Sequence, residues 1–98
     1  MFNMTNLKRE DIQELLKEMI VTHDGGRLNL QYEDIDKNAT LISDLGFDSL
    51  DVVELSSNIE NKLKIQLNES DVEKIMMREN VDFLADFLFQ RYQETYRI

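Results

Sequence analysis

The spacing of apolar residues near the start of the chain is that of a surface helix. In the segment LKREDIQELLKEMI the apolar side chains recur three and four residues apart, at Ile12, Leu15, Leu16, Met19 and Ile20. Such a stripe buries one side of an α-helix and leaves the charged side chains on the other side. We therefore predict a first helix from Leu7 to Thr22.

A long connection separates this helix from three others. Residues 23–47 hold all three glycines and many Asn and Asp, which is typical of a loop. The apolar residues within it are expected to pin the loop to the core: Leu28, Leu30, Tyr32, Ile35, Leu41, Ile42 and Leu45. The segment THDGG is predicted to end the first helix.

The second half of the chain predicts three helices. The second helix begins at Asp48 as its N-cap and runs to Leu63, and a short third segment is capped by Asn68 or Ser70. The segment NVDFLADFLFQRYQETY forms the last helix. The chain has no proline and no strand pattern, so the predicted fold class is all-α. We expect a single domain over residues 1–98, a small four-helix bundle with a long loop between the first and second helices and a short third helix.

The second helix has two different sides when its residues are placed at about 100° per residue. An inward stripe is formed by Val52, Leu55, Ser56, Ile59 and Leu63. The outer side carries Leu50, Val53 and Ser57, bordered by Glu54 and Glu60. This outer strip has two interpretations. One is that it has no function, since single exposed apolar residues are common on protein surfaces. The other is a docking surface for a partner that has an apolar groove and a basic rim.

Charge and composition limit the classes of molecule that the protein is expected to bind. Twenty acidic against eleven basic residues give a formal charge of −9, so nucleic acid and anionic membranes are disfavoured and basic proteins are favoured. Cysteine is absent, which leaves neither disulfides nor thiolate metal sites. The N-terminal segment lacks the apolar core of a signal peptide, and no apolar run reaches the ~18 residues of a membrane span. We expect a cytoplasmic protein that is monomeric on its own.

Ser49 is the residue whose chemistry needs an explanation. It lies in the first turn of the second helix, where free backbone N–H groups and the helix dipole favour an anion such as an esterified phosphate. The alternative is an ordinary serine beside the Asp48 cap. A hydrolase nucleophile fits poorly, because GFDSL is not the G-x-S-x-G elbow. His23, the one histidine, is interpreted as a solvated turn residue and not as a base for Ser49.

The segment DLGFDSLDVVELSSNIENKL resembles the acyl carrier proteins, including the peptidyl and aryl carriers of related assembly lines. The resemblance lies in Asp44-Leu45-Gly46, then Asp48-Ser49-Leu50, then Val53, Glu54 and Leu55. In that family a separate magnesium-dependent transferase moves a phosphopantetheine arm from coenzyme A to the serine. The resemblance therefore implies that Ser49 is the attachment site and that Asp48 contributes to the metal site of the transferase complex. Ser49 needs no base of its own, because the catalysing groups belong to the transferase.

The resemblance also implies a function and partners. The protein would be a carrier and not an enzyme, holding acyl intermediates as thioesters and presenting them to synthases of fatty-acid or polyketide-like biosynthesis. The partners would be the phosphopantetheinyl transferase and acyl synthases and transferases with basic docking patches. The docking residues would be Leu50, Val53, Glu54, Ser57 and Glu60. An unmodified acidic adaptor for a basic partner is the alternative. No metal site is expected within the chain, since DGGRLNLQYEDI fails the calcium-loop pattern.

Several positions depart from the pattern of fatty-acid carriers. Ser57 replaces a larger apolar residue, Asn61 an acid and Asn68 a proline, and MMREN, THDGG and QRYQETYRI lengthen two connections and the C-terminus. These departures favour a specialised, stand-alone carrier of a polyketide-like pathway. Four large side chains are interpreted as core in preference to the lining of an acyl chamber: Met76, Met77, Phe83 and Phe87.

Overall fold

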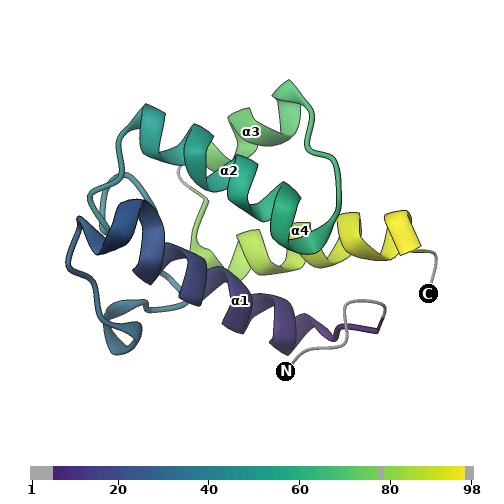
Figure 1. Cartoon of the computed structure of the whole chain (residues 1–98), viewed down its shortest axis with the longest axis horizontal. Coiled ribbons are helices and arrows are strands. Elements are labelled where there is room, and N and C mark those ends of the chain that lie inside the picture. The colour runs from purple at the N-terminus through teal and green to yellow at the C-terminus, as the bar shows by residue number, and fades with distance from the viewer. Residues whose placement is uncertain (1–5, 78, 97–98) are drawn as a thin grey trace.

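A computed structural model describes residues 6–77 and 79–96 and shows a bundle of helices (Figure 1). Its elements are α1 (Arg9–Thr22), α2 (Ser49–Leu63), α3 (Glu69–Met76) and α4 (Val81–Tyr96). Within the described ranges, β-type pairing is limited to an isolated bridge between Thr40 and Asn80. The predicted all-α fold with a short third helix is confirmed. The single-domain prediction also covers residues 1–5, 78 and 97–98, which lie outside the described residues, and it stays a prediction.

The start of each central helix is closed by a reciprocal pair of hydrogen bonds. On α2, the Asp48 side chain accepts from the backbone N–H of Asp51, and the Asp51 side chain accepts from the N–H of Asp48. Asn68 and Asp71 repeat this arrangement on α3, so Asn68 is the cap. Each pair satisfies backbone donors that the helix itself leaves without partners.

The helices pack as two pairs around one core. Contacts are most extensive between α1 and α4, and α2 packs on α3 and α1 (Figure 1). The inward stripe predicted for α2 is confirmed, since its residues are all buried: Val52, Leu55, Ser56, Ile59 and Leu63. The Ser56 hydroxyl donates to the carbonyl of Val52, which satisfies the one polar group in this stripe. Among the described helices, none is long and apolar enough to cross a bilayer.

The long loop lies against the bundle at the end where α1 stops and α2 starts (Figure 1). Three of its predicted anchors are buried, Ile35, Leu41 and Leu45, and Leu28 and Leu30 are partly buried against the core. The prediction is wrong for Tyr32 and Ile42, which are exposed. Two 3-10 turns, His23–Gly26 and Tyr32–Asp34, shorten the irregular part of the loop. Their residues make local backbone bonds that an apolar periodicity does not reveal.

Two tyrosines fasten the last helix to the rest of the bundle. The buried hydroxyl of Tyr92 accepts from the backbone N–H of Leu7 at 2.8 Å. The hydroxyl of Tyr96 donates to the carbonyl of Leu63 at 3.0 Å, next to Lys64, which ends α2 in a left-handed conformation (φ 55°). The C-terminal turns of α4 therefore hold both the start of α1 and the end of α2.

The core assignment of four large side chains is only partly correct. Phe87 is buried and Met76 packs against the core, whereas Met77 and Phe83 are exposed. Met77 follows the last residue of α3 and has a non-helical backbone (φ −84°, ψ 51°), so it leaves the inward stripe of that helix. Phe83 lies in the first turn of α4, directly before the buried Leu84, and turns outward.

Candidate functional site: the first turn of α2

Ser49 is the first residue of α2, and its side chain is exposed. Buried residues lie before and after it in the chain. Gly46 turns the chain with φ +82°, a left-handed conformation that side chains oppose, and the next residue, Phe47, is buried. Asp48 and Ser49 then emerge at the surface before Asp51 is buried again. The serine is therefore presented on a short exposed turn between two buried residues.

Asp51 is the most heavily bonded side chain of this turn. Its Oδ2 accepts from the backbone N–H of Asp48 at 3.0 Å. Its Oδ1 accepts from His23 Nε2 at 2.9 Å and from Arg27 Nη2. These donors hold the pKa of the Asp51 carboxyl well below its usual range, with the Asp48 amide the largest cause, then Arg27 and then His23. The same contact with Asp51 raises the pKa of Arg27 further.

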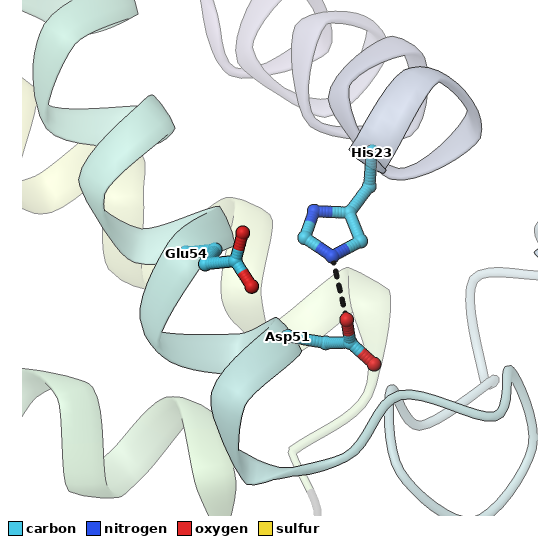
Figure 2. A group of neighbouring side chains, drawn as sticks. All are labelled: His23, Asp51 and Glu54. Atoms are coloured by element: carbon cyan, nitrogen blue, oxygen red, sulfur yellow. Dashed lines mark hydrogen bonds and ion pairs between the residues drawn. The ribbon is translucent and has the colours of Figure 1, made fainter. Parts of the chain in front are cut away.

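The prediction that His23 is a solvated turn residue is wrong. The residue is 3 % exposed, and its ring stacks on Phe47, with centroids 4.8 Å apart and an interplanar angle of 26°. Figure 2 shows its Nε2 directed at Asp51, 28 residues further along the chain. The ring is buried because the end of α1 lies beside the start of α2. Nε2 bonds Asp51 in this arrangement. That His23 does not act as a base for Ser49 stays a prediction.

The outer strip of α2 lies where the sequence places it. Leu50 is 66 % exposed and Val53 47 % exposed, and Glu54 and Ser57 are exposed beside them. Glu60 is half-buried, and its Oε2 accepts from the backbone N–H of Leu67 at 2.8 Å. Glu60 therefore also holds the connection between α2 and α3 in place.

An open groove of about 380 Å³ adjoins this strip on the side of α3. It is lined by Val53, Leu67, Asn68, Glu69, Val72 and Glu73. Its lining combines apolar side chains, Val53, Leu67 and Val72, with two carboxylates, Glu69 and Glu73. Val53 belongs to both the outer strip and the groove, so the two surfaces adjoin.

Two residues of this site were not found from the sequence. Asp51 had a signal, because it stands three residues after the Asp48 cap, the position where an acidic side chain closes a capping box. Arg27 had no such signal in the sequence, because it lies in an irregular loop and its contact with Asp51 depends on how that loop folds back.

Three side chains around Asp51 form a cluster that could hold a metal ion. His23, Asp51 and Glu54 each offer one ligand atom, and these atoms lie within 4.8 Å of one another (Figure 2). His23 and Asp51 are buried and Glu54 is exposed. The guanidinium of Arg27 already contacts the same oxygen of Asp51 that faces His23.

Comparison with known proteins decides the family. Residues 25–88 match the family described as "Phosphopantetheine attachment site". The chain belongs to the acyl carrier protein family. The acyl carrier protein of Buchnera aphidicola subsp. Acyrthosiphon pisum (strain 5A) is 34% identical over 78 residues, which cover 79% of this chain and 92% of the relative. That of Wolinella succinogenes is 38% identical over 60 residues, 61% of this chain and 74% of the relative.

Membership in the acyl carrier protein family establishes the general chemistry. Acyl carrier proteins carry acyl groups on a covalently attached 4′-phosphopantetheine and are carriers, not catalysts; this confirms the predicted function and cofactor. When attached, the arm supplies the thiol on which the acyl group is held as a thioester. Fatty-acid synthesis is the usual role of such carriers, which interact with phosphopantetheinyl transferases and synthases. The exposed hydroxyl at the start of α2 fits a phosphate ester.

Proposed function

We propose that Ser49 carries the phosphopantetheine arm of this acyl carrier protein. The observation that supports this most is its exposed place in the first turn of α2, between the buried residues Phe47 and Asp51. A phosphodiester there lies at the positive end of the helix dipole, and the arm extends away from the core. No part of the core has to open for the transferase to reach the hydroxyl.

Asp48 is proposed as a contributor to the metal site in the transferase complex. Its side chain is exposed, and one oxygen, Oδ1, accepts the capping bond from the Asp51 amide. A carboxylate beside the reacting hydroxyl suits Mg²⁺, which prefers oxygen ligands and uses few of them from the protein. The residue thus has a structural role in the carrier and a proposed second role when the transferase binds.

The proposed docking surface consists of Leu50, Val53, Glu54, Ser57 and Glu60. The large exposed fractions of Leu50 and Val53 support it, because these side chains gain from being covered by an apolar groove. The carboxylates around them steer a basic partner, while each exposed ion pair adds only about 0.2–1 kcal/mol. Complexes of this kind form quickly and release easily, as a carrier that serves several enzymes requires.

The preference for a specialised carrier of a polyketide-like pathway is also a proposal. It rests on Ser57, Asn61 and Asn68 and on the longer connections. Asn68 has a structural reason to differ from proline, since its side chain caps α3. We further propose that the protein is a monomer located in the cytoplasm, which light scattering and cell fractionation would test.

The decisive experiment is intact-mass measurement after incubation with coenzyme A, Mg²⁺ and a broad-specificity transferase. The wild type should gain one phosphopantetheine, and Ser49→Ala should gain none. Ser70→Ala is the matched control, because Ser70 is also an exposed serine in the first turn of a capped helix, α3. It should be modified like the wild type. If the transferase modifies other carriers but not this one, the proposal is wrong and the unmodified acidic adaptor takes its place.

A further inference from the structure

We propose that His23, together with Arg27, is a positioning residue for the modification of Ser49. This inference rests on the proposed attachment at Ser49 and adds to it the part of the chain that orients the attachment turn. The key relationship is that one side chain, His23, contacts a residue on each side of that turn, Phe47 before it and Asp51 after it.

The contact before the turn is a stack of two buried rings. The imidazole of His23 lies on Phe47 at 4.8 Å between centroids, and both residues are almost completely buried. Phe47 immediately precedes Asp48, so the direction in which the chain leaves this ring pair sets the direction of Asp48 and Ser49. Stacked rings of this kind have a preferred geometry and restrict each other's rotation.

The contact after the turn is a hydrogen bond to Asp51. The Asp51 carboxylate is ionised and can only accept, so Nε2 of His23 carries the hydrogen of the 2.9 Å bond. The other ring nitrogen, Nδ1, is buried and has no hydrogen-bond partner among the described residues. The ring therefore directs its one polar contact with the described protein at Asp51, whose second oxygen holds the amide of Asp48.

Arg27 also bonds Asp51, from the protein surface. Its guanidinium bonds Asp51 through Nη2 and Asp24 through Nε, and its side chain is 49% exposed. Its charge offsets that of the buried Asp51 carboxylate, whose isolation in the protein would be costly. The loop after α1 and the start of α2 are thereby joined across Asp51.

The consequence concerns the reaction at Ser49 more than the stability of the fold. In the transfer, the serine oxygen bonds to the phosphorus that carries the pantetheine group, the bond from that phosphorus to the nucleotide half of coenzyme A breaks, and the serine proton is released. The oxygen must approach along a defined direction, and a displacement of about 1 Å can cost up to a hundredfold in rate. A turn anchored on both sides presents the hydroxyl in one orientation. Replacement of His23 should therefore leave Asp48 and Ser49 exposed but less strictly oriented.

A metal ion at His23, Asp51 and Glu54 is the competing explanation of this cluster. The described contacts favour positioning, because Arg27 already provides a positive charge at Oδ1 of Asp51. The other oxygen of Asp51 is taken by the Asp48 amide. A metal ion would have to displace Arg27 and the bond from His23.

The protein contains a matched control for this arrangement. On α3, Asn68 and Asp71 form the same capping pair, Asp71 is also buried, and Arg91 contacts its Oδ1 at 2.7 Å. Asp71 thus resembles Asp51 in its bonds but lies on a helix that does not carry Ser49. Asp71→Asn should lower the melting temperature without changing transfer to Ser49.

The test measures kcat and KM of phosphopantetheine transfer with the full chain, below the melting temperature of every variant. His23→Phe keeps the stacked ring and loses the donor, and it should lower kcat about tenfold with KM changed by less than about twofold. His23→Gln keeps a donor near the Nε2 position and should restore kcat to within about threefold of the wild type. Arg27→Gln, which alters an exposed side chain, should lower kcat about threefold.

Each outcome bears on the proposal. It is overturned if folded His23→Phe transfers at the wild-type kcat, or if Asp71→Asn slows transfer as much as His23→Phe does. If His23→Phe does not fold, Arg27→Gln decides, and a wild-type kcat for it overturns the proposal. A zinc-dependent rise in melting temperature that both His23→Gln and Glu54→Gln abolish would assign the cluster to a metal ion and also overturn it. An unmodified wild type would contradict the proposed function itself.

Discussion

Val52 and Val53 are neighbours with identical side chains, yet α2 buries the first completely and leaves 47% of the second exposed. Consecutive residues of a helix point about 100° apart, so a single step moves the side chain from the core to the docking surface. The inner and outer sides of α2 can therefore be changed independently. This separation makes the proposed docking surface testable without unfolding the protein.

A charge at each valine should have a different effect. Val52→Asp buries an unpaired carboxylate and should destabilise the fold by about 4 kcal/mol. Val53→Asp should leave the melting temperature nearly unchanged but slow phosphopantetheine transfer, because the new charge would be desolvated against the partner. Thermal unfolding and transfer kinetics on both variants check this. Equal melting temperatures for the two variants would show that Val53 belongs to the core and not to the docking surface.

Reversal of a single charge at Glu54 should affect association. Glu54→Lys replaces an attractive charge with a repulsive one, so association with the transferase should slow and depend less on salt. Glu14→Lys is the control, since it makes the same change in net charge at an exposed position on α1. Stopped-flow association at several salt concentrations distinguishes them. If both variants slow equally, only the overall charge matters and the docking surface loses its support.

The net charge of −9 should make the fold sensitive to salt. Within the described ranges, ion pairs to carboxylates come from Arg9, Arg27, Arg91 and His23, and many acidic side chains have no basic partner. Added NaCl or millimolar Mg²⁺ should therefore raise the melting temperature by screening or binding these charges. Differential scanning calorimetry measures this, and a melting temperature that stays constant or falls with salt contradicts it.

Asp51 should contribute to stability in a pH-dependent way. The hydrogen bonds from Asp48, Arg27 and His23 hold its pKa in the folded protein below the unfolded value of about 3.9. Its ionised form therefore stabilises the fold above about pH 4, and this contribution is lost as the pH falls further toward the folded pKa.

Thermal unfolding of Asp51→Asn against wild type tests this pH dependence. The difference in melting temperature should be largest near neutral pH and shrink below about pH 4. Glu73→Gln removes the same charge from an exposed position on α3 and separates the effect of net charge. A difference between Asp51→Asn and the wild type that stays constant down to low pH would show that the carboxylate contributes through packing alone.

Most of the fold could be predicted from the sequence because it depends on local signals. The apolar spacing of α1 and α2 predicts their inward sides, and the capping residues Asp48 and Asn68 predict where α2 and α3 begin. The serine also stands out locally, because it follows a helix cap within a recognisable segment. These features need no knowledge of how distant parts of the chain meet.

The features that could not be predicted depend on contacts between distant residues. His23 lies among polar and glycine residues, and nothing near it in sequence indicates that Phe47 and Asp51 cover it. Met77 is apolar and follows a helix, but its backbone is no longer helical and its side chain is exposed. Burial at these positions is decided by the tertiary arrangement and not by composition.

The bond from Tyr96 to the carbonyl of Leu63 has a consequence for the entropy of binding. It holds the end of α2, while His23 and Arg27 hold its start, so the helix is fastened at both ends by distant parts of the chain. A surface on such a helix has little backbone freedom to lose when a partner covers it. Most of the free energy of its weak, brief contacts can then contribute to partner selectivity, because little of it offsets the ordering of the carrier itself.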